Sequence, residues 1–208
     1  MTAAATTLSP RMGWLTRIGW VLILCLCLGV AAWSARYLID PPGTVEEALG
    51  NALGVPWLVI HVGGSATALA LGSLQFLPGL RRGSGSHRWI GRTYVLGCLV
   101  GGASGLVLAT GSWAGPIATA GFGSLAVLWI GANLLGWRAA VQGRMADHRR
   151  WMIRSWALTL AAVTLRLYLP TAIALELPFP PAYRAIAFLC WVPNMFVAEW
   201  WLSRRART

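Results

Sequence analysis

The sequence predicts an all-α integral membrane protein, a bundle of six transmembrane helices with both termini in the cytoplasm. The first observation behind this prediction is the length of the apolar stretches, each close to the roughly 20 residues that a bilayer core requires. They run over residues 16–37, 55–78, 89–110, 116–138, 150–173 and 183–203. With 57% hydrophobic residues in a chain of 208, one compact bundle accounts for nearly the whole sequence.

The second observation is the distribution of arginine between these stretches. All 17 basic residues are arginines, and 14 of them precede the first stretch, flank the second and fourth turns, or follow the last stretch. These 14 are Arg11, Arg17, Arg81, Arg82, Arg88, Arg92, Arg138, Arg144, Arg149, Arg150, Arg154, Arg204, Arg205 and Arg207. Because arginine accumulates on the cytoplasmic side of membrane proteins, the pattern predicts that both termini are cytoplasmic. The net charge of +11 then indicates contact with anionic lipid head groups, and no nucleic-acid partner.

The first stretch predicts a retained helix, because its apolar run of about twenty residues exceeds the core of a signal peptide. It is rich in Leu, Val and Ile and is expected to lie at the edge of the bundle. We divide the chain into a short cytoplasmic tail (1–15), one transmembrane domain (16–203) and a basic cytoplasmic tail (204–208). The four cysteines lie inside apolar stretches and are expected to act as small hydrophobic residues.

Glycine dominates the second, third and fourth stretches. Gly97, Gly101 and Gly105 are spaced four residues apart and therefore share one face of the third helix. Small residues at this spacing let two helix backbones approach closely in lipid, so the third helix is expected at the centre of the bundle. In the sixth stretch, Pro193 and Asn194 predict a break near the middle, where Asn194 is available to bond a backbone group that the proline leaves free.

Two segments at the predicted cytoplasmic turns resemble each other. The segment 87–96 and the segment 148–158 both read His, Arg, Trp, then Arg, Thr or Ser, an aromatic residue and Leu, if one inserted residue is allowed. Gly64-Ser65 and Gly123-Ser124 match at a similar distance upstream. The second and third helices are therefore a possible parallel repeat of the fourth and fifth. The alternative is that any cytoplasmic helix start attracts Arg and Trp.

Polar residues at the cytoplasmic third of the helices form the first candidate site. At about 1.5 Å per residue, several side chains come to a similar depth there: Gln75, His87, Arg92, Asn133, His148, Arg154 and Glu199. Glu199 is the carboxylate at this depth, so we expect it to pair with Arg92 or Arg154. The remaining positive charge would suit a haem propionate, a lipid phosphate or a quinone carbonyl. The alternative is that these arginines only reach the interface and tie helices together.

The second candidate site lies nearer the outer face. His61 and Arg166 are each about seven residues from the outer ends of their helices, some 10 Å deep. No carboxylate lies in a neighbouring stretch at that depth, which makes Arg166 a costly residue. Arg154 and Arg166 are about 120° apart around their helix and should face different neighbours. His61 would ligate a cofactor, relay protons or simply bond a backbone carbonyl.

Three classes of function remain open from these residues. The first is a membrane redox role with bound b-type haem, for which His87 and His148 are the candidate iron ligands, or with a bound quinone. The second is a small-solute or proton-coupled transporter that uses His61, Arg166 and Glu199. The third is a non-catalytic lipid-binding or assembly factor. The sequence lacks the phosphate loop, zinc-protease and nucleotide-binding motifs, so no familiar class of membrane enzyme is indicated.

Three blocks of sequence resemble a known family. They are Gln75-Phe76-Leu77-Pro78 with His87-Arg88-Trp89 through Tyr94; His148-Arg149-Arg150-Trp151 through Arg166; and Cys190-Trp191-Val192-Pro193-Asn194 with Glu199-Trp200. The pattern is similar to a bacterial family of predicted multi-pass inner-membrane proteins whose members carry a domain of unknown function, and the resemblance covers roughly residues 50–203. It implies a location in the bacterial inner membrane and assigns no catalytic residue.

Overall fold

The computed structural model describes residues 14–39, 54–75 and 84–205, and within these ranges the chain forms helices and turns with no strand. The helices are α1 (Trp14–Ile39), α3 (Gly54–Leu74), α5 (Ser84–Thr110), α6 (Pro116–Val141), α7 (Met145–Thr159), α8 (Ala161–Ala174), α9 (Phe179–Leu189) and α10 (Val192–Arg205). Arg11, Arg81, Arg82, Arg207 and most of the predicted amino-terminal tail lie outside the described residues.

The six predicted spans are confirmed. Six helical segments are long and apolar enough to cross a membrane: Arg17–Ile39, Gly54–Leu74, Gly85–Thr110, Pro116–Val141, Met145–Ala174 and Phe179–Arg205. The fifth span combines α7 with α8, and the sixth combines α9 with α10. Many large apolar side chains on these spans are exposed, as expected for surfaces that face lipid.

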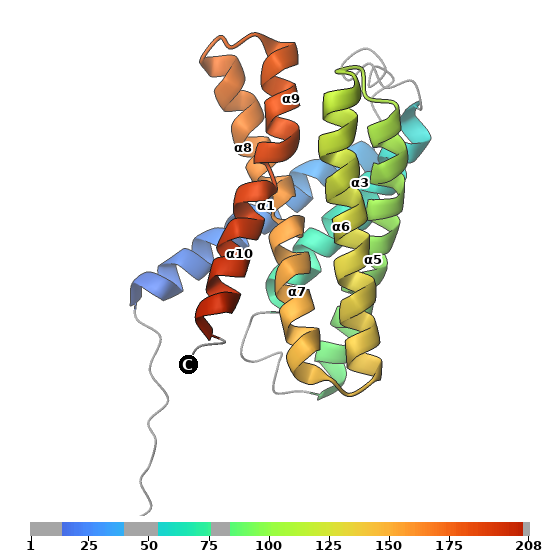
Figure 1. Cartoon of the computed structure of the whole chain (residues 1–208), viewed down its shortest axis with the longest axis vertical. Helices are drawn as coiled ribbons and strands as arrows, with labels where there is room; N and C mark the ends of the chain where they lie inside the picture. The colour runs from blue at the N-terminus through green and yellow to red at the C-terminus, as the bar shows by residue number, and fades with distance from the viewer. Residues whose placement is uncertain (1–13, 40–53, 76–83, 206–208) are drawn as a thin grey trace, which may run out of the picture.

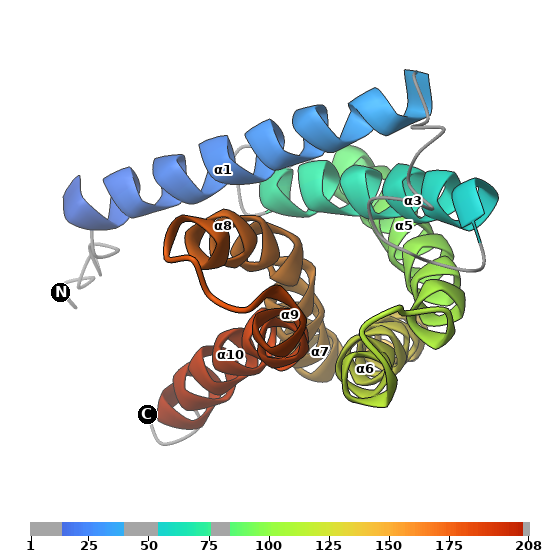
Figure 2. The same cartoon turned by 90° about the horizontal axis from the view of Figure 1, so that it is seen from above.

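Helices α3 to α10 run between two ends of the molecule. Figure 1 shows the turn between α6 and α7 at one end of the molecule and the turn between α5 and α6 at the other. We call the end that holds residues 142–144 the basic end, and the end that holds residues 111–115 the far end. Seen from above in Figure 2, α3, α5, α6 and α7 follow an arc, α8 and α9 continue it, and α1 runs along the outside of α3 and α8.

The glycine face of α5 packs against α3, as its spacing predicts. A Cβ atom built on Gly64 would lie 2.6 Å from the backbone nitrogen of Gly101 and 2.8 Å from the carbonyl oxygen of Gly97. One on Gly105 would lie 2.9 Å from Nδ1 of His61. These distances are too short for any side chain, so the glycines set how closely α3 and α5 approach. The predictions that the third span is central and the first peripheral agree with the structure, since α5 is the most buried of the six spans and α1 the least.

The predicted break in the last span is present at Cys190 and Trp191, between α9 and α10. The carbonyl of Cys190 accepts hydrogen bonds from the hydroxyl of Thr164 on α8 and from Nδ2 of Asn194, the latter at 3.1 Å. Asn194 therefore bonds a backbone carbonyl, as its position next to Pro193 suggests. A second interruption, at Leu160 between α7 and α8, carries no proline or glycine and is not signalled by the sequence.

The two matching His-Arg-Trp segments share a local contact. The guanidinium of Arg92 lies 5.2 Å from the ring centroid of Trp89, and that of Arg154 lies 4.8 Å from the centroid of Trp151. The upstream glycines differ, because Gly64 contacts the backbone of α5 while a Cβ on Gly123 would meet only a Leu106 methyl at 3.9 Å. The repeat stays a prediction.

Candidate functional site: a cavity within the membrane spans

A cavity of about 240 Å³ lies within the bundle, in the half nearer the far end. Residues from α1, α3, α5, α6, α7, α8 and α9 line it, so it is formed by the whole arc of helices. Ser112 and Trp113 of the α5–α6 turn also line it. Because every spanning segment contributes, the cavity is a property of the tertiary fold and cannot be located from one stretch of sequence.

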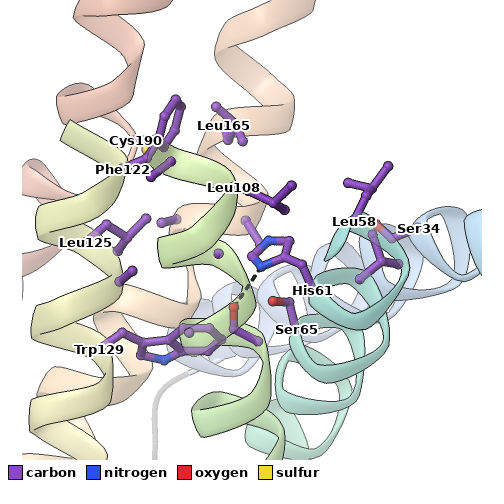
Figure 3. Close-up of a pocket in the computed structure, with 18 of the residues that line it drawn as sticks. Ser34, Leu58, His61, Ser65, Leu108, Phe122, Leu125, Trp129, Leu165 and Cys190 are labelled. Atoms are coloured by element: carbon purple, nitrogen blue, oxygen red, sulfur yellow. Dashed lines mark hydrogen bonds between the residues drawn. The ribbon is translucent and has the colours of Figure 1, made fainter. Parts of the chain in front are cut away.

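His61 projects from α3 toward this cavity (Figure 3). Its Nδ1 lies 2.8 Å from the carbonyl oxygen of Gly101. Since a carbonyl only accepts, Nδ1 carries the proton, and in the neutral ring Nε2 is left as an acceptor. Nε2 makes no hydrogen bond to any described residue. The α3–α5 glycine contact thus fixes the ring by one nitrogen and leaves the other for a ligand.

Arg166 lines the same cavity from α8. One terminal nitrogen donates to the carbonyl of Ala162 at 3.0 Å, and the other donates to the hydroxyl of Ser34 on α1 at 2.7 Å. No carboxylate among the described residues forms an ion pair with it. Whether Arg166 has a carboxylate partner in the whole chain stays a prediction. A guanidinium with spare donors beside an apolar cavity is a site for an electron-rich group.

The walls of the cavity are mainly apolar and aromatic. Figure 3 shows Phe122, Leu125 and Trp129 on the side opposite His61 and Ser65. At the far end, Trp113 lies 5.5 Å from Tyr183 between ring centroids, and Phe122 lies 5.5 Å from Tyr183. These rings cover the part of the cavity nearest the far end, and their flat surfaces suit a planar ligand. The hydroxyls of Ser65 and Ser112, which line the cavity, are buried and have no hydrogen-bond partner among the described residues.

A buried polar network closes the other side of the cavity. Nε1 of Trp129 donates to the hydroxyl of Thr159 at 2.9 Å, and the hydroxyl of Tyr94 lies 2.9 Å from the same oxygen. The Tyr94 hydroxyl also lies 2.7 Å from that of Ser155. These bonds join α5, α6 and α7 and hold Trp129 and Thr159 in place at the cavity floor. Sequence reasoning missed Tyr94, Trp129, Thr159 and Ser34, because single polar or aromatic residues in an apolar helix give no signal until their neighbours are known.

The basic end brings together one of the predicted pairs. Arg154 donates from Nε to one oxygen of Glu199 at 2.6 Å and from a terminal nitrogen to the other at 2.9 Å. The predicted partnership of Glu199 is therefore with Arg154, and Arg92 stacks on Trp89 instead. Nε2 of Gln75 donates to the backbone carbonyl of His87 at 3.4 Å, which links the end of α3 to the start of α5. Asn133 is fully buried and donates to the carbonyl of Trp129 on its own helix.

The two histidines of the basic end lie at the starts of different helices. Nδ1 of His148 on α7 lies 2.9 Å from the carbonyl of Gly136 on α6, the same type of bond that His61 makes with Gly101. Neither His87 nor His148 lines the central cavity. Across the described ranges, no cluster of three or more His, Cys, Asp or Glu side chains has the spacing of a metal site. The cysteines in these ranges are free thiols, three of them buried, in keeping with the small hydrophobic role expected of them.

Comparison with known proteins identifies the family. A family model described as "Predicted membrane protein (DUF2306)" matches residues 58–202, which is well over half of the chain. Comparison with curated proteins and with solved structures gives no match. The match spans α3 to α10 and includes both His61 and Arg166. The chain therefore belongs to the DUF2306 family of predicted membrane proteins, whose function is unknown.

Proposed function

We propose that this protein binds the head group of a membrane quinone in the central cavity, in a membrane redox role. The observation that carries the proposal is the placement of His61, which is held through Nδ1 by the Gly101 carbonyl and has Nε2 without a bond to the described residues. Arg166 lines the same cavity and supplies a cation with unused donors.

The chemistry of a quinone matches these groups. A quinone ring is flat and carries carbonyl oxygens that accept hydrogen bonds, and its reduced form carries hydroxyls that donate them. Nε2 of neutral His61 accepts from a quinol hydroxyl, and Arg166 donates to a quinone oxygen. The rings of Phe122, Trp129 and Tyr183 offer packing surfaces for the head group.

The size of the cavity favours a ligand with a small ring system. Its volume of about 240 Å³ lies below the range of roughly 300–1,000 Å³ typical of pockets for drug-sized molecules. A quinone head group is one or two fused rings, whereas a porphyrin is a macrocycle of four linked rings. The central cavity therefore suits the quinone better than haem.

The test measures quinone binding to the purified protein in detergent. Binding is monitored by the quenching of tryptophan fluorescence, since Trp113 and Trp129 line the cavity. We expect the tail-less pair duroquinone and duroquinol to quench saturably. The His61→Phe variant should bind duroquinol about tenfold more weakly or worse, because it loses the hydrogen bond that a quinol hydroxyl donates to Nε2.

The matched control is His148→Phe. That histidine makes the same bond to a backbone carbonyl but does not line the cavity, so quinone affinity should stay within about twofold of wild type. Equal affinity of wild type and His61→Phe would overturn the proposal. Saturable binding of fatty acids in place of quinones would instead support the lipid-binding alternative, and proton-coupled uptake into vesicles would support a transporter.

A b-type haem is the second candidate, and it belongs to the basic end. The supporting observation is that the Gly136 carbonyl fixes Nδ1 of His148 and leaves Nε2 for iron, an arrangement typical of histidine ligands. His87 would be the second ligand, and a bound haem would supply one-electron chemistry. A Soret band in protein purified from membranes, lost in both His87→Ala and His148→Ala, would support this candidate. A colourless preparation without extractable haem would exclude it.

We also infer that the protein lies in the bacterial inner membrane with both termini in the cytoplasm. The support is the gathering of arginine at the basic end, where Arg204 and Arg205 stack on Trp200 and Trp201 in the way interfacial residues do. This end is expected to contact anionic lipid head groups. Reporter fusions after residue 113 should report the outside and fusions after residue 143 the inside; the reverse result would contradict the orientation.

A further inference from the structure

A groove on the lipid-facing side of the molecule adjoins the central cavity. It has a volume of about 320 Å³ and is lined by Gly29, Val30 and Trp33 of α1 and by Arg166, Leu169 and Pro170 of α8. Figure 2 shows α1 running past α8 on the outside of the arc. The groove therefore lies between α1, the most peripheral span, and α8, which forms part of the cavity wall.

The groove and the cavity share residues. Val30 and Arg166 line both, so the two spaces meet at these side chains. The hydrogen bond from Arg166 to the Ser34 hydroxyl crosses from α8 to α1 at this junction. A ligand that occupies both spaces would pass beside the guanidinium.

The surroundings of the groove are apolar and face the bilayer. On α1, Leu26, Leu28 and Trp33 are exposed, and on α8, Leu167 and Ile173 are exposed. In a membrane protein such surfaces contact hydrocarbon chains. Pro170 has no amide hydrogen, so α8 lacks the helical bond to the Arg166 carbonyl, and the helix is less constrained where it borders the groove.

We propose that this groove holds the apolar tail of the quinone, and that the ligand enters sideways from the bilayer between α1 and α8. The inference rests on the proposed function and extends it, because it assigns a lipid tail to the ligand and a route to the cavity. The head group reaches His61 and Arg166 from the groove, and the tail stays against Gly29, Trp33 and Leu169.

Gly29→Trp tests the groove directly. A Cβ on Gly29 has no atom within 4 Å, so there is open space where a larger side chain would begin, and Gly29 itself lines the groove. We expect the affinity for decylubiquinone, which carries a ten-carbon tail, to fall about tenfold, because the indole takes the space of the tail and removes its packing contacts with the groove. The affinity for tail-less duroquinone should stay within about twofold.

Gly19→Trp is the matched control, since Gly19 is on the same helix, also has open space at its Cβ position and does not line the groove. It should change neither affinity. The milder Gly29→Leu is measured in parallel, so that the test survives if the tryptophan variant folds poorly; it should weaken decylubiquinone binding by a smaller factor.

The outcomes separate the two proposals. Unchanged decylubiquinone affinity in folded Gly29→Trp and Gly29→Leu would overturn the groove while leaving the head-group site intact. Equal losses for both quinones would also overturn it, because the effect would then be on the cavity. Failure of both quinones to bind wild type would overturn the proposed function itself.

Discussion

Two arginines of one membrane span, Arg154 on α7 and Arg166 on α8, have opposite surroundings. Arg154 lies at the basic end, where Glu199 accepts two hydrogen bonds from it and Trp151 stacks on its guanidinium. Arg166 lies nearer the far end, where it donates to the hydroxyl of Ser34 on α1 and to the carbonyl of Ala162 on its own helix. A guanidinium has five N–H donors, of which Arg166 uses two among the described residues.

Under the proposed function, this difference separates a structural role for Arg154 from a binding role for Arg166. A cation paired to a carboxylate in bidentate geometry ties two helices together, here α7 and α10. A cation with spare donors next to a cavity remains able to bind a ligand. Binding would offset the free-energy cost of placing the charge within a membrane span. Since the far end has no ion pair among the described residues, packing and neutral hydrogen-bond acceptors hold it.

The largest effect on stability is therefore expected from packing between α3 and α5. In Gly64→Ala the new methyl group would lie 2.6 Å from the backbone nitrogen of Gly101, and neither backbone can move without opening the cavity wall. We expect a loss of about 1–3 kcal/mol in the free energy of unfolding, measured by SDS titration in mixed micelles. Gly131→Ala on α6, where no atom lies within 4 Å, is the control and should be neutral.

The second prediction concerns Arg166 itself. Arg166→Met keeps the length of the side chain and removes the charge, so quinone affinity should fall about tenfold. The free energy of unfolding should change by about 1 kcal/mol or less, because the lost hydrogen bonds to Ser34 and Ala162 are offset by removing a cation that has no carboxylate partner among the described residues. Arg154→Met should show the reverse, with affinity kept and stability reduced. If both variants behave alike in both assays, the two arginines do not differ as we argue.

The third prediction is a smaller coupling between Arg154 and Glu199. Their side chains are 24% and 47% exposed, which limits the strength of the pair. In a double-mutant cycle with Arg154→Met and Glu199→Gln, the coupling in unfolding free energy should be about 0.5–1 kcal/mol. The same cycle with Arg92→Met in place of Arg154→Met should give no coupling, because Arg92 stacks on Trp89 and has no contact with Glu199.

Sequence reasoning located the spans and the glycine face, and it limited the partner of Glu199 to Arg92 or Arg154, because each follows from one-dimensional rules. Length and hydropathy define a span, four-residue spacing defines a helix face, and depth limits which charges can meet. It also placed His61 and Arg166 at a similar depth, but could not show that both line one cavity. That requires the curvature of the arc and the position of α1, which depend on packing between spans distant in sequence.

The groove and the buried polar network at the cavity floor could not be predicted from the sequence for the same reason. Ser34 becomes informative only because α1 passes beside α8, and Thr159 only because Trp129 and Tyr94 reach it from other helices. The interruption at Leu160 has no proline or glycine to signal it. Such features depend on tertiary neighbours that a single apolar helix sequence does not specify.

The smallest effect is expected at the break between α9 and α10, where one carbonyl has two donors. Thr164 and Asn194 both donate to the carbonyl of Cys190, so either donor alone still satisfies that oxygen. We expect Asn194→Ala to cost about 0.6 kcal/mol of unfolding free energy, the average for a polar contact between membrane helices, and Thr164→Val a similar amount. The double variant leaves a buried carbonyl without either donor and should cost more than the sum of the two. Strict additivity of the three values would show that the two side chains act independently, and that the carbonyl of Cys190 is not their common partner.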